Sequence, residues 1–441
     1  MKNYSYSFVI ANFALVFFLL MPMYNSPFGK LGGEIIIFMF ITPMVISTFQ
    51  FKDIKILSPF LFGVISILLT WHSTSQKFPN VMLIDGLIPT LSYSRNLVFG
   101  IIGLYLGKNM HAQEVKQFVK NFFYCALLIT FFAIGQANFQ FVREFTIHYY
   151  SSIPGEAWLL EDSIFILLKE RPMSTLDRTW AYSYFAAVIF LSSISLPGFF
   201  RTKMMQYSST VIFLIGLIYS GTRSAVLSVI AGLCLLIFTN TAVIEKRRNL
   251  IVKISGVIIL FVIPSITYTY GFNRLNWFYN PFILGISGSA EEIQTSNSYL
   301  SRILYIERQL QIFSNNPVFG RLASIGWKHT DNLYISRLAY GGVIGLACTL
   351  MVPSAFLLIN RKVKKYSTHI KNLSSHLILG NLLFWSAFCG LVMGIAWDFF
   401  VANRAMYFFI FIYSLLSGQL INIRSKSTEN ISTTKANLSY V

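Results

Sequence analysis

A neighbouring acid and amide, with an imidazole beside them, form the most reactive group of side chains in this chain. Asn332 follows Asp331 directly, and His329 stands two residues before the acid. A carboxylate or an imidazole can take the proton from a hydroxyl group. The ordinary pKa of ~3.9 for aspartate and ~6.5 for histidine makes His329 the better match to neutral pH. Desolvation would raise the pKa of Asp331. We take Asp331 as the first candidate for a general base and His329 as the second.

An arginine at the start of an apolar helix is the candidate for binding an anion. Arg223 lies in Ser220-Gly221-Thr222-Arg223-Ser224, between two apolar runs. The first turn of a helix offers unpaired backbone N–H groups and a positive dipole end. A guanidinium adds paired donors that suit phosphate. The pattern predicts a site that binds pyrophosphate. The alternative is that Arg223 anchors its helix at the membrane surface.

Less specific roles are also open to the acid and to other arginines. Asp331 could cap the helix that follows it, or form an ion pair with Arg302 or Arg337. Arg178 and Arg95 stand at the mouths of two further apolar runs and are additional candidates for phosphate. For these two, an interface anchor is an equally good interpretation.

The composition excludes a water-soluble globular protein. The chain has 441 residues, of which 55% are hydrophobic and 12% charged, and its mean hydropathy is +0.60. A helix of roughly 20 apolar residues spans ~30 Å of hydrocarbon. We expect an all-α polytopic membrane protein, without a cleaved signal peptide, whose twelve apolar runs lie at about 5–23, 33–50, 55–71, 91–107, 117–136, 178–197, 208–221, 223–240, 250–270, 332–360, 375–397 and 399–422.

Charge sets the expected orientation. An even number of spans puts both termini on one side, and lysine and arginine concentrate in cytoplasmic connections. Basic clusters such as 361–365 then place both termini in the cytoplasm. The net charge of +18 is explained by loops that face anionic lipid, so no nucleic-acid partner is expected. We expect one membrane domain, residues 1–423, and a polar cytoplasmic tail at 424–441.

Two predicted outer connections, 137–177 and 271–331, are too long for simple turns. Inside the second, apolar residues recur at 4-3-4-3 spacing and predict an amphipathic helix that ends at Asn315-Asn316-Pro317. This helix either lies flat at the interface or carries a merely solvated basic face. Its apolar stripe comprises Tyr299, Ile303, Ile306, Leu310 and Phe313, and its other face Arg302, Tyr305, Arg308 and Gln309. Further on, Gly341 and Gly345 predict close packing between helices.

The order of these motifs resembles the O-antigen ligase and polymerase superfamily, and in particular the Wzy-type polysaccharide polymerases. The resemblance covers about 178–345: Ser-Gly-Thr-Arg-Ser at a helix start, a long outer loop with an arginine-bearing helix, Asn-Pro-x-x-Gly, Asp-Asn-x-Tyr and Gly-x-x-Gly. It implies a GT-C-like fold, and it implies that Arg302 binds the leaving pyrophosphate. Ligases usually carry His-Asn where this chain has Asp331-Asn332, a departure that favours a polymerase.

The resemblance further implies an inverting glycosyl transfer, independent of metal and cofactor, at the outer face of the bacterial inner membrane. The substrate would be an undecaprenyl-pyrophosphate-linked oligosaccharide repeat unit that is polymerised into O-antigen or a related surface polysaccharide. The implied partners are this lipid-linked sugar, membrane lipid and a chain-length regulator protein. The alternatives are a ligase that moves the finished chain to a lipid or protein, and a flippase or transporter of the lipid-linked sugar. No Asp-x-Asp pair or His/Cys cluster suits a metal ion in the outer loops.

Overall fold

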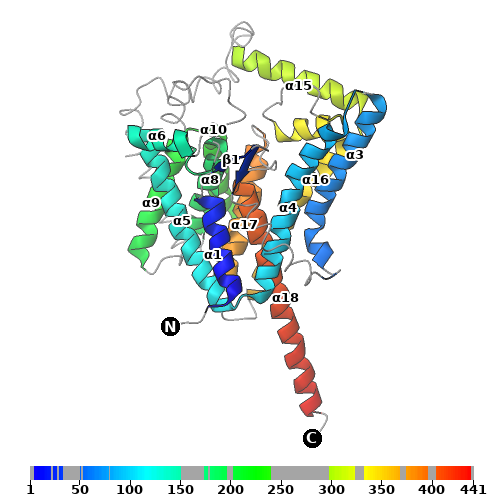
Figure 1. Ribbon diagram of the computed structural model, residues 1–441. Coiled ribbons are helices and arrows are strands. Elements are labelled where there is room, and N and C mark those ends of the chain that lie inside the picture. The colour runs from blue at the N-terminus through cyan, green and yellow to red at the C-terminus, as the bar shows by residue number, and fades with distance from the viewer. Residues whose placement is uncertain are drawn as a thin grey trace.

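Over the residues that the structure describes, the protein is a bundle of helices with one short hairpin (Figure 1). The computed structural model describes residues 4–20, 23–26, 29–32, 50, 53–78, 80–149, 173–176, 179–195, 202–239, 297–322, 332–367, 374–395 and 404–438. Its elements are α1 (Tyr6–Leu19), β1 (Met23–Ser26), β2 (Gly29–Gly32), α3 (Ile54–Lys77), α4 (Leu83–Asn109), α5 (Ala112–Asn138), α6 (Gln140–Tyr149), α8 (Thr179–Ser195), α9 (Lys203–Tyr219), α10 (Arg223–Thr239), α15 (Asn297–Asn315), α16 (Leu333–Ser367), α17 (Ser374–Met393) and α18 (Arg404–Leu438).

These elements confirm a predominantly α-helical, multi-pass membrane protein. In the described part of the chain, six helices are long and apolar enough to cross a membrane: α3, α4, α5, α16, α17 and α18. Shorter apolar helices include α1, α8 and α10. The expected runs at 33–50 and 250–270 lie outside the described residues, apart from Gln50, so the number of twelve spans stays a prediction. The antiparallel pair β1–β2 was not expected.

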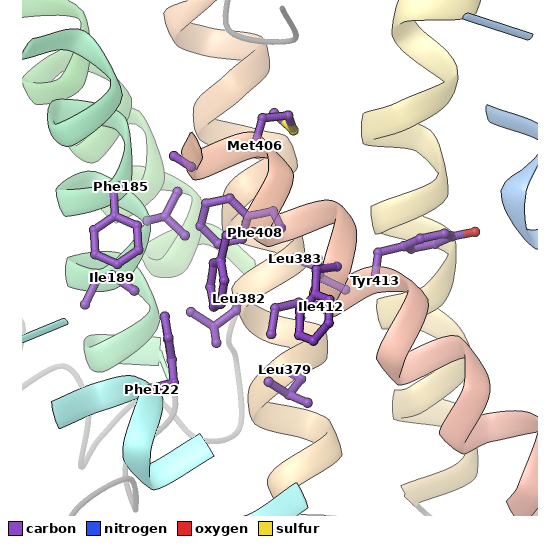
Figure 2. Close-up of a cluster of buried hydrophobic side chains, with 14 of the residues drawn as sticks. Phe122, Phe185, Ile189, Leu379, Leu382, Leu383, Met406, Phe408, Ile412 and Tyr413 are labelled. Carbon is purple, nitrogen blue, oxygen red and sulfur yellow. The ribbon is translucent and has the colours of Figure 1, made fainter. Parts of the chain in front are cut away.

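Aromatic and branched side chains fill the centre of the bundle, where α5, α8, α17 and α18 meet (Figure 2). Every residue of α8 from 181 to 195 is buried, and so is every residue of α18 from 405 to 420. The rings of Phe122 and Phe408 stack with centroids 5.0 Å apart. Such a pair contributes ~0.5–1.5 kcal/mol beyond the area that it buries. The helices that carry the site are therefore packed against a dense hydrophobic core.

Glycines bring α4 and α18 into backbone contact. A Cβ atom on Gly103 would lie 2.5 Å from the carbonyl oxygen of Phe411, and one on Gly418 would lie 2.5 Å from that of Leu104. Small residues allow this approach between membrane helices, where dispersion contacts replace the hydrophobic effect as the source of association. The two helices consequently form one unit along their shared length.

The bundle has two distinct ends. In Figure 1, α15 lies across one end, which we call the α15 end. The start of α1 and the C-terminal half of α18 lie at the opposite end, which we call the terminal end. An ion pair closes part of the terminal end, because Lys108 Nζ lies 2.6 Å from the nearly fully buried carboxylate of Asp53. The last turns of α16, with Arg361, Lys362, Lys364 and Lys365, also lie at the terminal end.

Candidate functional site

The start of α10 is fixed against the start of α8. Gly221 has a φ of 62°, a conformation that favours glycine, and it turns the chain between α9 and α10. The carbonyl oxygen of Thr222 accepts the first hydrogen bonds of α10, from the N–H groups of Ala225 and Val226. The Thr222 hydroxyl lies 2.6 Å from that of Ser183, one turn into α8. Two positive helix ends, those of α8 and α10, are thus held side by side.

The chain that leads into α8 is held by a buried amide. The Gln136 side chain, which is fully buried, accepts a hydrogen bond from Ser174 N at 2.8 Å and donates one to Ser174 O at 3.1 Å. Ser174 has a φ of 53°, unusual for a residue other than glycine. Its hydroxyl donates to Ile129 O at 2.6 Å. These bonds hold a strained turn four residues before Arg178.

The start of α16 is bonded to the end of α17. Asn332 caps α16, because its Oδ1 accepts from Ile335 N at 3.1 Å, and its Nδ2 donates to Ile395 O at 3.0 Å. The Tyr334 hydroxyl donates to Leu391 O at 2.6 Å. The amide and the tyrosine of Asp-Asn-x-Tyr thereby satisfy free carbonyl groups at the end of α17. The capping position that we considered for Asp331 is filled by Asn332.

Two glycines lock the Asn-Pro-x-x-Gly segment onto α16. At Gly342, with φ 62° and ψ −162°, the helix breaks into two pieces. Val343 N donates to Pro317 O at 2.9 Å, and Arg321 N donates to Ala339 O at 2.9 Å. A Cβ atom on Gly320, whose φ is 65°, would lie 2.5 Å from Gly341 N.

The prediction that Gly341 and Gly345 pack closely against another helix is wrong for the described residues. A Cβ atom on Gly341 would meet nothing within 4 Å, and one on Gly345 would meet only Arg337 O, at 3.5 Å. The close contact is made by Gly320 and Gly342 instead. Their positive φ values and facing backbones explain why both positions hold glycine.

The α15 helix exists as expected, but its inner face differs from the predicted stripe. Gln309 and Ile312 are buried, whereas Leu310 is 44% exposed. Gln309 Nε2 donates to the Tyr340 hydroxyl at 3.4 Å, which ties α15 to the first piece of α16. The predicted pattern placed Gln309 on the polar face and overlooked Ile312, because an amide that bonds to a neighbouring element has no hydrophobic signature.

Contacts place the starts of α8, α10 and α16 at one end of the bundle. Tyr184 bonds to Ser386, and Ser195 accepts from Asn381, so α8 runs antiparallel to α17 and begins near the end of α17. The start of α16 is bonded to that same end of α17. The segment that follows α15 is bonded to the kink of α16. The starts of α8, α10 and α16 and the segment that follows α15 thus lie together at the α15 end (Figure 1).

The structure describes only some of the predicted site residues. Asp331, His329 and Arg178 lie outside the described residues, as do the side chains of Arg223 and Arg302. Their proposed roles stay predictions. The prediction that Arg95 lies at the mouth of its helix is wrong: α4 begins at Leu83, which puts Arg95 ~18 Å along the helix axis, at ~1.5 Å per residue. Among the described residues, no group of three or more His, Cys, Asp or Glu could hold a metal ion.

Several positioning residues were missed by the sequence analysis. The roles of Gln136, Ser174, Ser183 and Asn332 give no periodic signal. Each depends on a hydrogen bond to a specific partner, and a single polar residue does not reveal that partner in the sequence. Thr222 and Asn332 stood inside motifs that the sequence analysis had singled out, but their contacts were not predicted.

Comparison with known proteins finds a family match over part of the chain. A family model described as O-Antigen ligase matches residues 208–350, a segment that runs from α9 through the kink of α16. No curated protein matches the chain. The matched segment contains the start of α10, the lock between Gly320 and Gly342, and the Asp331-Asn332 pair. The match over residues 208–350 supports the resemblance of this part of the chain to the O-antigen ligase and polymerase superfamily.

Proposed function

We propose that the protein is a membrane glycosyltransferase that polymerises undecaprenyl-pyrophosphate-linked oligosaccharide repeat units into O-antigen or a related surface polysaccharide. The observation that carries the proposal is the gathering of the starts of α8, α10 and α16 at the α15 end. In the sequence, Arg178 directly precedes α8, Arg223 is the first residue of α10, and Asp331 directly precedes Asn332, the cap of α16. An anion-binding helix pair beside a proton acceptor suits a sugar transfer with a diphosphate leaving group.

Helix ends and arginines would bind the leaving group. Two adjacent helix N-termini present unpaired N–H groups and partial positive charge, which favour a diphosphate. Arg223 and Arg178 stand at these two starts, and Arg302 lies in α15 at the same end. Fixed donors aimed at developing charge lower the transition state without reorganisation at the moment of reaction. Arg95, deeper in α4, is a more remote candidate for the same anion.

The bond changes are those of a direct displacement. The acceptor hydroxyl oxygen attacks the anomeric carbon of the donor sugar, and the bond from that carbon to the pyrophosphate oxygen breaks. Asp331, or His329 in its place, takes the hydroxyl proton. The polyprenyl diphosphate leaves as an anion held by the arginines. One displacement inverts the configuration at the anomeric carbon, and the grown chain then serves as the next donor.

A pair of arginine variants tests this proposal. Arg223→Ala is expected to abolish long chains and leave single repeat units on the lipid carrier. Arg361→Ala is the matched control, because Arg361 lies near the end of α16 at the terminal end of the bundle. It is expected to keep the normal chain-length profile. Both are expressed in a strain that lacks the gene, with equal protein levels, and the products are resolved by gel electrophoresis. Normal chain lengths with Arg223→Ala would refute the assignment.

A ligase is the second candidate, because the matched family carries the description O-Antigen ligase. A ligase would use the same leaving group but transfer the finished chain to a lipid or protein acceptor. Loss of a ligase leaves long chains unattached, whereas loss of a polymerase leaves single units only. The gel profile of the gene deletion therefore separates the two functions.

We also propose that the α15 end faces away from the cytoplasm and that both termini lie inside a bacterial cell. The clustered basic side chains at the terminal end, from Arg361 to Lys365, support this orientation through the positive-inside rule. The lipid-linked sugar would then be met at the outer face of the inner membrane, and a chain-length regulator protein would be the partner there. Labelling of single introduced cysteines from either side of the membrane tests the orientation.

A further inference from the structure

A pair of buried threonines on α3 holds the segment that follows α15. Thr70 and Thr74 are 3% and 2% exposed and stand one turn apart. The Thr70 hydroxyl donates to Phe319 O at 2.9 Å. The Thr74 hydroxyl accepts from Leu322 N at 3.0 Å. Both bonds join residues almost 250 positions apart in the sequence, and neither threonine lies within the family match at 208–350.

The Thr74 hydroxyl is used in both of its roles. It donates to Thr70 O within its own helix at 2.7 Å while it accepts from Leu322 N. The Thr70 hydroxyl oxygen lies 2.8 Å from Ser66 O and 2.9 Å from Phe319 O. Its single hydroxyl proton is therefore shared between these two carbonyl groups. A valine in either place would keep the shape and leave a buried backbone group without its partner.

Further contacts from the end of α3 hold the same segment. Lys77 Nζ donates to Asn316 Oδ1. The Arg321 guanidinium lies over the Phe78 ring, 4.0 Å from its centroid. On the opposite side, this segment is bonded to the kink of α16 through Val343 N and Arg321 N. Residues 316–322 thus connect α3 to α16 as a rigid bridge.

The bridge controls one end of a short helix. The first piece of α16, residues 333–341, is fixed at its start by Asn332 on the end of α17, and at its finish by the bridge. Asp331 lies two residues before the start of this piece in the sequence. A rotation of the piece about its bond to α17 would turn the backbone at Asn332, the residue that follows Asp331 in the sequence, relative to the starts of α8 and α10. Thr70 and Thr74 oppose that rotation through their hydrogen bonds to the bridge, and neither is one of the candidate catalytic residues.

We infer that Thr70 and Thr74 are positioning residues of the sugar transfer, acting through the bridge on the first piece of α16. The inference rests on the proposed function, because it needs Asp331 or its neighbour His329 to take part in the reaction. Neither threonine touches the donor or the acceptor in this scheme. Misplacement of a reacting group by about 1 Å can cost a factor of about 100 in rate.

Three single variants of the full-length protein test the inference. Thr74→Val removes the hydroxyl and keeps the shape, Thr74→Ser keeps the hydroxyl, and Thr349→Val is the matched control. Thr349 is 3% exposed, and its hydroxyl bonds to Gly345 O of its own helix at 2.8 Å, with no other hydrogen bond among the described residues. Purified proteins are assayed with a defined lipid-linked repeat unit, and kcat and KM for that substrate are measured.

The expected result is a kcat lowered about 10- to 100-fold by Thr74→Val, with KM for the lipid-linked substrate within about twofold of wild type. Thr74→Ser is expected to restore most of kcat, and Thr349→Val to behave as wild type. Equal kcat for Thr74→Val and Thr349→Val would overturn the inference. A rise in KM alone would also overturn it, because it would indicate a binding role. A wild-type protein that makes no polymer would instead refute the proposed polymerase.

Discussion

Substitution of Gly342 by alanine is the sharpest test of the kinked α16. The φ of 62° and ψ of −162° at this position belong to a region that is essentially restricted to glycine. A Cβ atom there would clash with the carbonyl group of Val318 and lie 2.7 Å from Phe319 N. All these neighbours are backbone atoms, so the clash cannot be relieved by a side-chain rotation. Either the bridge moves away from α16 or the kink changes its conformation.

The expected loss of stability follows from two contributions. Holding an alanine in this conformation costs ~1–3 kcal/mol. Separation of the bridge breaks the hydrogen bonds from Val343 N to Pro317 O and from Ile344 N to Val318 O, each worth ~0.5–1.5 kcal/mol net. The free energy of unfolding is therefore expected to fall by ~2–6 kcal/mol. That is a large fraction of the ~5–15 kcal/mol that stabilises a typical folded protein.

The neighbouring glycine supplies the control. Gly341→Ala adds a methyl group that meets nothing within 4 Å, and it lies in helical backbone. In a helix, alanine is more favourable than glycine by up to ~1 kcal/mol. The Gly341→Ala variant is therefore expected to be at least as stable to unfolding as the wild type. Thermal unfolding of both variants in detergent, followed by tryptophan fluorescence, gives the comparison. Equal melting temperatures for the two alanine variants would refute the account of the lock between Gly320 and Gly342.

Substitutions at four further residues have defined outcomes. Asn332→Ala removes the cap of α16 and the bond to the end of α17, and it is expected to lower the free energy of unfolding by ~1–3 kcal/mol in the same assay, whereas Asn332→Asp keeps the cap and loses less. Ser183→Ala removes the hydrogen bond to the Thr222 hydroxyl and is expected to cost ~0.5–1.5 kcal/mol; no change in denaturant midpoint would contradict this. Asp331→Asn is expected to lower the transfer rate by ~10²–10⁴, and His329→Gln to leave it nearly unchanged; the reverse order would identify His329 as the base.

The membrane helices were predictable because hydrophobic length alone identifies them. The runs at 55–71 and 117–136 correspond to α3 and α5, with ends shifted by a few residues. The start of α4 was missed, because Asp85 and Pro89 interrupt the hydropathy while helical geometry continues. Asp85 supports this start from within, since its carboxylate accepts from Met82 N at 2.9 Å. Arg95 was misplaced as a direct result.

The candidate site was predictable as motifs but not as contacts. Order and spacing were enough to single out Arg223 and the Asp331-Asn332 pair. Sequence alone did not show that Gly342 breaks its helix, because a glycine pair in an apolar run also fits straight, closely packed helices. Nor did it indicate Gln136 or Thr74, whose partners lie 38 and 248 residues away. Long-range hydrogen bonds between neutral side chains and backbone leave no local periodicity from which to infer them.

The anchoring of Leu322 to α3 and of Asn332 to α17 has a consequence for the residues between them. These two fixed points bracket residues 323–331, the stretch that includes His329 and Asp331. Under the proposed function, residues of this stretch other than His329 and Asp331 can be exchanged while the two anchoring hydrogen bonds stay in place. Chimeras joined at Leu322 and Asn332 would then test whether this stretch sets the choice of acceptor sugar.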